Sequence, residues 1–197
     1  MTLAPLIIIS GPSGSGKSTL IRAVLAAKRS LLRLAISATT RPPRPGEIDG
    51  VDYHFWPLEK FRQCLAEGTF LEHAQVHGKH YYGTPRGEVD GYRERGVGVI
   101  LDIDVQGAAQ VRPLYPDHLS VFVALSDPET YGRRLRQRGS DGEETIARRM
   151  ETATRELARV HEYQYVILND DLEQAVRRLL DLIERQRNHS QGDDDAR

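Results

Sequence analysis

Continuous apolar runs alternate along this chain with segments whose apolar residues recur at helical spacing. The runs predict buried strands of the parallel type at residues 3–10, 32–36, 97–103, 119–125 and 165–168. The spaced segments predict helices over residues 16–28, from about 105, and over 130–138, 143–162 and 171–187. Asp127 and Pro128 are a typical cap and first residue for the helix at 130–138. This alternation indicates an α/β fold, in which helices wrap a parallel sheet through right-handed crossovers.

The segment 37–84 interrupts that alternation. It opens with a loop, Arg41-Pro-Pro-Arg-Pro-Gly-Glu47, whose prolines and glycine oppose regular structure. Short strands are expected at 51–56 and 69–76, around a helix at 58–66. A further helix should run from Pro85 to Glu94, with proline at a first position where its missing N–H costs nothing. We therefore expect a small strand-rich insertion beside the main sheet.

Length and composition limit the remaining possibilities. A chain of 197 residues suits one domain, and 39% hydrophobic with 28% charged residues can build a core. A net charge of −1 gives no reason to expect binding to nucleic acids or membrane surfaces. The single Cys64 excludes an internal disulfide and a cysteine-based metal site, and no apolar run is long enough to span a bilayer. We expect a soluble, cytoplasmic protein with a disordered polar tail at 189–197.

A phosphate-binding motif stands between the first strand and the first helix. Gly11-Pro12-Ser13-Gly14-Ser15-Gly16-Lys17-Ser18, followed by Thr19, matches G-x-x-x-x-G-K-[ST] at every fixed position. The glycines allow successive N–H groups to point at phosphate oxygens, and the helix N-terminus adds its dipole. Lys17 places a cation on the β and γ phosphates, while the Ser18 hydroxyl can bind Mg²⁺. The motif predicts a nucleoside triphosphate site.

A triphosphate site alone does not identify the reaction. A GTPase requires a base-reading motif of the Asn-Lys-x-Asp type, which is absent, and Asn169-Asp170-Asp171 does not replace it. A remodelling ATPase needs a longer chain and an acidic strand end, and Leu101-Asp102-Ile103-Asp104 resembles such an end without discriminating. A small-molecule kinase and an inactive scaffold also remain open at this point.

The insertion carries a second set of chemically capable side chains. Five phosphate-binding donors are gathered there: Arg41, Arg44, Tyr53, Tyr81 and Tyr82. Two carboxylates, Glu47 and Glu72, lie among them in the sequence. Arginine with tyrosine suits a phosphomonoester, and a carboxylate suits a group with paired donors, such as N1–H and N2–H₂ of guanine. The block therefore favours a phosphorylated acceptor.

At these residues the sequence resembles guanylate kinase, a P-loop kinase family. The resemblance runs in order along nearly the whole chain, from about residue 5 to 185, through the stretches 11–19, 37–47, 50–55, 82–85, 100–107, 134–139 and 169–171. The T-T-R-x-P-R-x-G-E and L-D-I-D-x-Q-G runs are specific to this family among P-loop kinases. The segment 78–82 is one residue longer than the commonest family spacing, which leaves open whether Tyr81 or Tyr82 faces the phosphate, with Tyr82 favoured.

The resemblance implies ATP-dependent phosphorylation of GMP to GDP, in purine nucleotide metabolism, with Mg²⁺. It implies that the GMP phosphate is bound by Arg41, Arg44, Tyr53 and Tyr82, with Glu47 in the GMP-binding set. It implies that guanine is read by Glu72 with Ser37 and Thr84, and that Asp102 lies near the acceptor and the metal. The catalytic cations would be Lys17, Arg41 and the lid arginines Arg134, Arg138 and Arg149.

The same resemblance divides residues 1–188 into three parts. The core would comprise 1–36, 85–136 and 160–188, the GMP-binding insertion 37–84, and a helical lid about 137–159. Two alternatives stay open: a related P-loop kinase with another phosphorylated acceptor, such as a ribose bisphosphate, and a guanylate-kinase-like scaffold module that binds peptides. Such modules typically have an eroded phosphate loop, whereas Lys17 and Ser18 are intact here. Tolerance of dGMP and the oligomeric state are not determined by these patterns.

Overall fold

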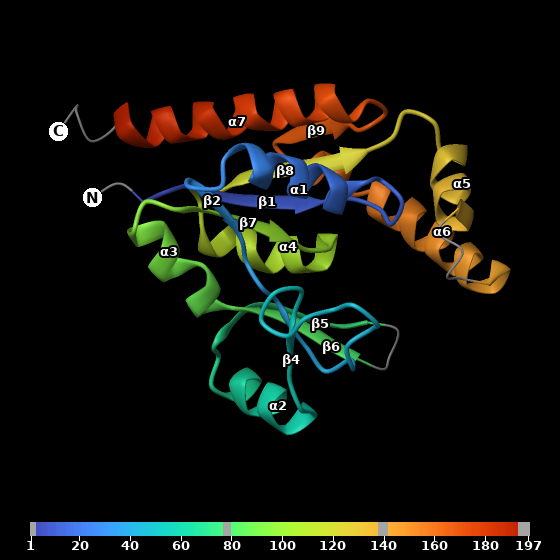
Figure 1. Cartoon of the computed structure of the whole chain (residues 1–197), viewed down its shortest axis with the longest axis horizontal. Coiled ribbons are helices and arrows are strands. Elements are labelled where there is room, and N and C mark those ends of the chain that lie inside the picture. The colour runs from blue at the N-terminus through green and yellow to red at the C-terminus, as the bar shows by residue number, and fades with distance from the viewer. Residues whose placement is uncertain (1–2, 77–79, 138–141, 193–197) are drawn as a thin grey trace.

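Two separate sheets and a pair of projecting helices organise the molecule. The computed structural model describes residues 3–76, 80–137 and 142–192. Figure 1 shows the larger sheet between layers of helices, the smaller sheet on one side of it, and helices α5 (Glu129–Gln137) and α6 (Glu143–Leu157) at one end. The two sheets and the helix pair therefore surround a common region.

The larger sheet has five strands, and every neighbouring pair is parallel. Its order is β2 (Leu32–Leu34), β7 (Gly98–Asp102), β1 (Leu6–Ser10), β8 (Leu119–Ala124) and β9 (Tyr165–Leu168). The prediction of a parallel sheet wrapped by helices is confirmed. In the β1–β7 register Ile9 pairs with Asp102, so the loop after β1 and the end of β7 meet at one edge of the sheet.

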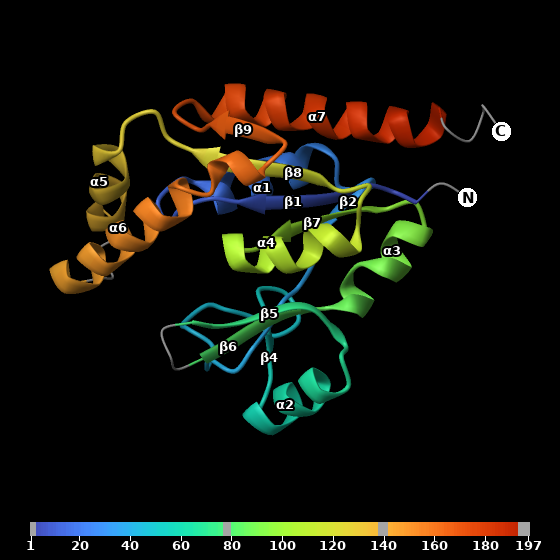
Figure 2. The same ribbon diagram turned by 180° about the vertical axis from the view of Figure 1, so that it is seen from behind.

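Alternating side chains of β1 enter two different cores. Leu6 and Ile8 pack on the face covered by α4 (Val105–Val111) and α3 (Asp90–Glu94). Ile7 and Ile9 pack on the opposite face, against α1 (Lys17–Ala27) and α7 (Leu172–Gly192), and Figure 2 shows these two helix layers from behind. Because both faces are covered, every residue of the strand is buried, which explains the unbroken apolar run.

The smaller sheet belongs to the insertion. Its order is β4 (His54–Phe55), β3 (Ala38–Thr39), β6 (His80–Pro85) and β5 (Phe70–Val76), and α2 (Leu58–Ala66) packs on it through Phe61. The strand expected at 51–56 is wrong except for its residues 54–55. Its first part is a turn, in which the N–H groups of Val51 and Asp52 both donate to the Ile48 carbonyl, at 3.2 and 3.0 Å. These N–H groups are therefore not available for a strand ladder, and Asp49 Oδ1 accepts from the Phe55 N–H at 2.8 Å where β4 ends.

The helices expected at 85–94 and 143–162 have other bounds in the structure. Pro85 is the last residue of β6, where it pairs with Phe70, and a 3₁₀ turn (Arg86–Glu88) precedes α3. The helix expected at 143–162 ends at Leu157 and is followed by a 3₁₀ turn (Val160–Glu162). Arg159 Nε and Arg112 both donate to the Glu162 carboxylate, which ties that turn to the core. The predicted cap is confirmed, since Asp127 Oδ1 accepts from the Glu129 N–H at 3.0 Å.

The C-terminal helix is longer than expected. A disordered tail from residue 189 is wrong for residues 189–192, because α7 continues to Gly192. Residues 193–197 lie outside the described part of the chain. Among the helices that the structure describes, none combines the length and apolar character needed to cross a bilayer.

Candidate active site

The phosphate loop, residues 11–18, joins β1 to α1 and depends on its glycines. Gly11, Gly14 and Gly16 have φ values of 145°, 92° and 86°, which residues other than glycine rarely adopt. A Cβ on Gly11 would also lie 2.1 Å from the Val123 carbonyl oxygen of β8. The loop can therefore run this close to the sheet only with glycine at these places, and it leads directly into the N-terminus of α1.

Lys17 places its ammonium group over this loop. Its Nζ donates to the Gly11 carbonyl at 2.7 Å and lies 3.7 Å from Asp102 Oδ1 at the end of β7. The parallel register of β1 and β7 is the reason that these residues, far apart in sequence, meet. Lys17 and Asp102 thus stand side by side at the carboxyl edge of the sheet, where ligands bind in open α/β sheets.

A cavity of about 360 Å³ opens on the outer side of the phosphate loop. Its walls are Gly14, Gly16, Thr19, Arg134, Gln137, Asn169, Asp170 and Leu172. Asn169 Nδ2 donates to the Ser15 carbonyl at 2.8 Å, and Arg134 donates to the Gly14 carbonyl at 3.4 Å and the Asn169 carbonyl at 3.3 Å. Sequence reasoning gave Asn169 no role, although it directly follows β9 at the same sheet edge as Asp102. Arg134 lies beside the loop, where it holds main-chain carbonyls.

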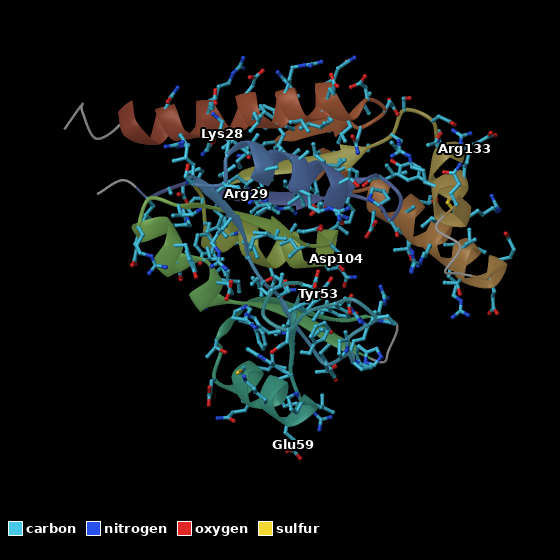
Figure 3. The ribbon with its side chains drawn as sticks, viewed as in Figure 1. Lys28, Arg29, Tyr53, Glu59, Asp104 and Arg133 are labelled. Atoms are coloured by element: carbon cyan, nitrogen blue, oxygen red, sulfur yellow. The ribbon has the colours of Figure 1, made fainter. Side chains whose placement is uncertain are left out.

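A second cavity, of about 160 Å³, lies between the insertion and the core. It is lined by Ser37, Tyr53, Glu72, Ala74, Tyr82, Asp102, Ile103 and Asp104. Figure 3 labels Tyr53 from the insertion and Asp104 from the core, which face one another across this region. The fold therefore gathers around one cavity five of the residues that the sequence singled out, each from a separate stretch of chain.

The inner end of this cavity is formed by a buried carboxylate. Glu72 on β5 is only 6% exposed, and burial raises its pKa to about 7, with the Asp104 charge adding to the shift. Thr84 Oγ1 donates to Glu72 Oε1 at 2.7 Å and lies 3.1 Å from Ser37 Oγ. Thr84 is itself completely buried, so it holds Glu72 from behind while Ser37 faces the cavity. The arrangement presents carboxylate oxygens to a ligand with paired donors.

Arg41 is not itself a wall residue of this cavity, but it contacts Tyr82, which is one. Its Nη1 and Nη2 each donate to one oxygen of Glu47 at 2.8 Å, and its Nε donates to the Tyr82 hydroxyl at 3.1 Å. The hydrogen bond to Arg41 lowers the pKa of Glu47 to about 2, and the same bond raises the pKa of Arg41. Both Glu47 oxygens are engaged, one of them also by the Arg44 N–H at 2.7 Å. This placement assigns Glu47 to orienting Arg41 rather than to the cavity wall.

The positions of Tyr81 and Tyr82 indicate which of the two faces the cavity and could bind a phosphate. The Tyr82 ring packs edge-on against Tyr53 at 5.9 Å, and both rings line the cavity. Burial raises the pKa of Tyr53, so its hydroxyl keeps its proton and can donate. Tyr81 instead packs against Phe61 at 5.6 Å, inside the small core of the insertion. The placement therefore favours Tyr82 over Tyr81, while the Arg44 side chain is exposed.

The acidic groups near Lys17 fit an ion that phosphates and water complete. Within residues 3–76, 80–137 and 142–192, no three His, Cys, Asp or Glu side chains form a metal cluster. Asp104 is occupied as the cap of α4, since its Oδ1 accepts from the N–H groups of Gln106 and Gly107 at 2.9 and 2.8 Å. The hydroxyl of Ser18 and the carboxylate of Asp102 remain as oxygen donors beside the phosphate loop. One or two protein oxygens with phosphate and water suit Mg²⁺.

Helix α6 adds a carboxylate that the sequence did not single out. A cavity of about 300 Å³ separates it from β5 and α4, with walls at Ala74, Gln75, Asp104, Val105, Gln106, Thr152, Arg155, Glu156 and Arg159. Burial raises the pKa of Glu156 to about 7, and the charge of Lys17 opposes this shift. The expected lid residue Arg149 is half-buried on α6, two turns before Glu156 and so on the same face. Arg138 lies outside the described residues.

Comparisons with known proteins agree on one family. The family model for guanylate kinase matches residues 4–186. A guanylate kinase from Alkalilimnicola ehrlichii is 47% identical over 87% of this chain and 83% of that protein. One from Symbiobacterium thermophilum is 47% identical over 90% of this chain and 83% of that protein. The crystal structure of guanylate kinase from Anaplasma phagocytophilum superposes with a TM-score of 0.76 at 29% identity, covering 95% of this chain and 88% of that one.

Proposed function

The chain belongs to the guanylate kinase family, and from that membership we propose how its residues transfer a phosphoryl group from ATP to GMP. It is a nucleoside monophosphate kinase, for which the reaction is ATP + GMP → ADP + GDP. The observation that carries the residue assignments is the cavity between insertion and core, with a buried carboxylate at one end and, at the other, two tyrosines, one of which accepts from Arg41.

We place GMP across this cavity. Arg41, preoriented by Glu47, and the hydroxyls of Tyr53 and Tyr82 bind its phosphate as donors. Glu72 accepts from guanine N1–H and N2–H₂, and Ser37 faces the same cavity beside it. Asp102 and Lys17 stand where the two nucleotides would approach one another. Arg44 supplies a further exposed cation near the phosphate end.

The ATP phosphates belong on the phosphate loop. Its N–H groups, the α1 N-terminus and Lys17 neutralise them, and Ser18 with Asp102 would hold Mg²⁺. Bound Mg²⁺ supplies charge neutralisation at the β and γ phosphates. Lys17 must then release the Gly11 carbonyl and turn its ammonium group toward a phosphate oxygen. Asn169 fixes the loop through Ser15, and the cavity beside Arg134 leaves room for the rest of ATP.

Positioning and charge neutralisation account for the chemistry. The second pKa of a phosphomonoester is about 6, so the GMP phosphate is mostly a dianion at neutral pH and needs no general base. Two multiply charged phosphates must approach, and Lys17 and Arg41 offset their repulsion. In this proposal the lid is the segment expected at about 137–159, which contains α6, extended by α5, which carries Arg134; its arginines are Arg134, Arg138 and Arg149. Closure after GMP binds would exclude water from ATP.

A coupled assay of ADP release tests the assignment of Glu72. Wild type, Glu72→Gln and the control Glu59→Gln are compared on GMP, AMP, CMP and UMP. Glu59 lies on α2 at the far end of the insertion, where the same loss of charge should change nothing (Figure 3). Glutamine offers one donor and one acceptor, so the efficiency with GMP should fall by at least about 2 kcal/mol in transition-state terms. Efficiency with AMP should rise relative to GMP. An unchanged GMP-to-AMP ratio would mean that Glu72 does not read the base.

A further inference from the structure

Gly107 is a glycine whose backbone does not require one. It lies buried in the first turn of α4, and its φ is not among the positive values found in the described residues. Glycine inside a helix is about 1 kcal/mol less favourable than alanine. A close contact, rather than the backbone conformation, must therefore account for glycine at this position. Gly107 is also the last residue of the L-D-I-D-x-Q-G run.

The contact is with the Glu72 carboxylate. A Cβ placed on Gly107 would lie 2.7 Å from Glu72 Oε2, 3.2 Å from its Cδ and 3.4 Å from its Cγ. The first distance is shorter than real Cβ contacts allow, so alanine would require the carboxylate or the helix to move. Glu72 lies directly against the bare backbone of α4, and no side chain separates them.

Glu72 has little freedom to yield in other directions. Its Oε1 accepts from the buried Thr84 hydroxyl at 2.7 Å. Its main chain is approached as closely by a second glycine, since a Cβ on Gly83 would lie 2.9 Å from the Glu72 carbonyl oxygen. Thr84 holds one oxygen and Glu72 lines the ligand cavity, so a carboxylate pushed away from Gly107 would move toward that cavity.

Resting on the proposed function of Glu72, we propose that Gly107 is a positioning residue that sets the depth of the guanine-reading carboxylate. Two parallel hydrogen bonds to N1–H and N2–H₂ require the carboxylate to stay in plane and in reach of the base, to within about 0.5 Å. The Gly107 N–H also donates to Asp104 Oδ1 at 2.8 Å. One residue of α4 thereby positions two of the three carboxylates that line the cavity, Glu72 by its missing side chain and Asp104 by its N–H.

The test compares Gly107→Ala with a matched control in another helix. Gly91 of α3 has room for a methyl group, since the nearest atom to its Cβ would be Arg95 Nη1 at 3.7 Å. We expect Gly107→Ala to raise the KM for GMP at least about tenfold, the effect of one weakened charge-assisted hydrogen bond. The GMP-to-AMP efficiency ratio should fall, while the KM for ATP stays within about twofold of wild type. Gly91→Ala should leave the KM for GMP, the KM for ATP and the GMP-to-AMP efficiency ratio unchanged. Equal losses for GMP and ATP would overturn the inference.

Glu72→Gln in both backgrounds separates this inference from the proposed function. If Gly107 acts through Glu72, Gly107→Ala lowers the GMP-to-AMP ratio in wild type and not in the Glu72→Gln background. If Glu72→Gln alone leaves that ratio unchanged, the proposed role of Glu72 is wrong whatever Gly107 does. If Glu72→Gln lowers the ratio but Gly107→Ala does not, only the inference is wrong.

A variant that does not fold still gives an answer. Glu72→Asp shortens the side chain by one methylene and withdraws it from Gly107. If Gly107→Ala lacks a cooperative thermal transition, the double variant with Glu72→Asp should recover one, because the collision is relieved. Failure to recover would show that the methyl group collides elsewhere, and the inference would be abandoned.

Discussion

Replacing Glu72 with glutamine should make the nucleotide-free protein more stable at alkaline pH while it weakens GMP binding. The carboxyl is 6% exposed, and burial raises its pKa from 4.5 to about 7. A buried carboxylate without a cation is costly to ionise. Glutamine keeps the shape and can still accept from Thr84, but it carries no charge. Ionisation of Glu72 therefore lowers the folding stability of the nucleotide-free protein, and it provides the negative charge that accepts hydrogen bonds from the base.

The magnitude follows from proton linkage. Since the pKa of Glu72 is raised on folding, the folded state holds the proton more tightly, and this contribution is fully present below pH 4.5. It is lost as pH rises through about 7. At about 1.36 kcal/mol per pKa unit, the total loss is about 3 kcal/mol, most of which falls between pH 5 and 8.5. The glutamine variant has no such loss, so its advantage over wild type should grow by that amount.

Urea unfolding of both proteins at several pH values between 5 and 8.5 measures this difference. The pH dependence of wild type alone could not be attributed to Glu72, because burial also raises the pKa of Glu156 to about 7. The difference between wild type and Glu72→Gln removes the contribution of Glu156, and Glu59→Gln supplies an exposed control whose difference should stay flat. A difference for Glu72→Gln that does not change with pH would refute the reasoning, since it would mean that Glu72 ionises without cost in the folded protein.

The same group should make GMP binding depend on pH. Guanine N1–H and N2–H₂ need the ionised carboxylate, so binding should weaken as pH falls through about 7. Because the GMP phosphate titrates near pH 6, guanosine serves as the probe that lacks it. Guanosine affinity should fall about tenfold from pH 8 to pH 6 for wild type and stay constant for Glu72→Gln.

Three further predictions concern the ATP side and the lid. Lys17→Met should retain the fold but lose at least about 3 kcal/mol of transition-state stabilisation in kcat/KM, and turnover within tenfold of wild type would remove Lys17 from the mechanism. Asn169→Ala should raise the KM for ATP several-fold with little change for GMP, because the donor to the Ser15 carbonyl is lost; equal effects on both substrates would contradict this. Hydrogen exchange over residues 129–137 and 143–157 should slow most when ATP and GMP analogues are both bound, and identical exchange in all ligand states would contradict lid closure.

Local spacing in the chain was sufficient to predict the fold class. The apolar runs predicted the strands of the larger sheet, most clearly β1, in which every residue is buried because helices cover both faces of the sheet. The phosphate loop could also be predicted from the sequence, since its glycines and Lys17 lie within eight consecutive residues. Short elements were predicted poorly. The two-residue strands β3 and β4 and the 3₁₀ turn after Pro85 depend on partners and on aspartate side chains that no local pattern reveals.

The candidate site was predictable as a set of residues and not as an arrangement. Residue types and the family resemblance pointed to Arg41, Glu47 and Glu72, but only the folded chain turns Glu47 toward Arg41 and away from the cavity wall. Parallel pairing brings Asp102 to Lys17, and the packing of β5 on α4 lays Glu72 against Gly107. Sequence therefore determined which chemical groups this protein carries, because those follow from residue type and local spacing. Tertiary structure decided which groups touch, how deeply a carboxylate is buried and hence how it titrates, because these depend on contacts between segments far apart in the chain.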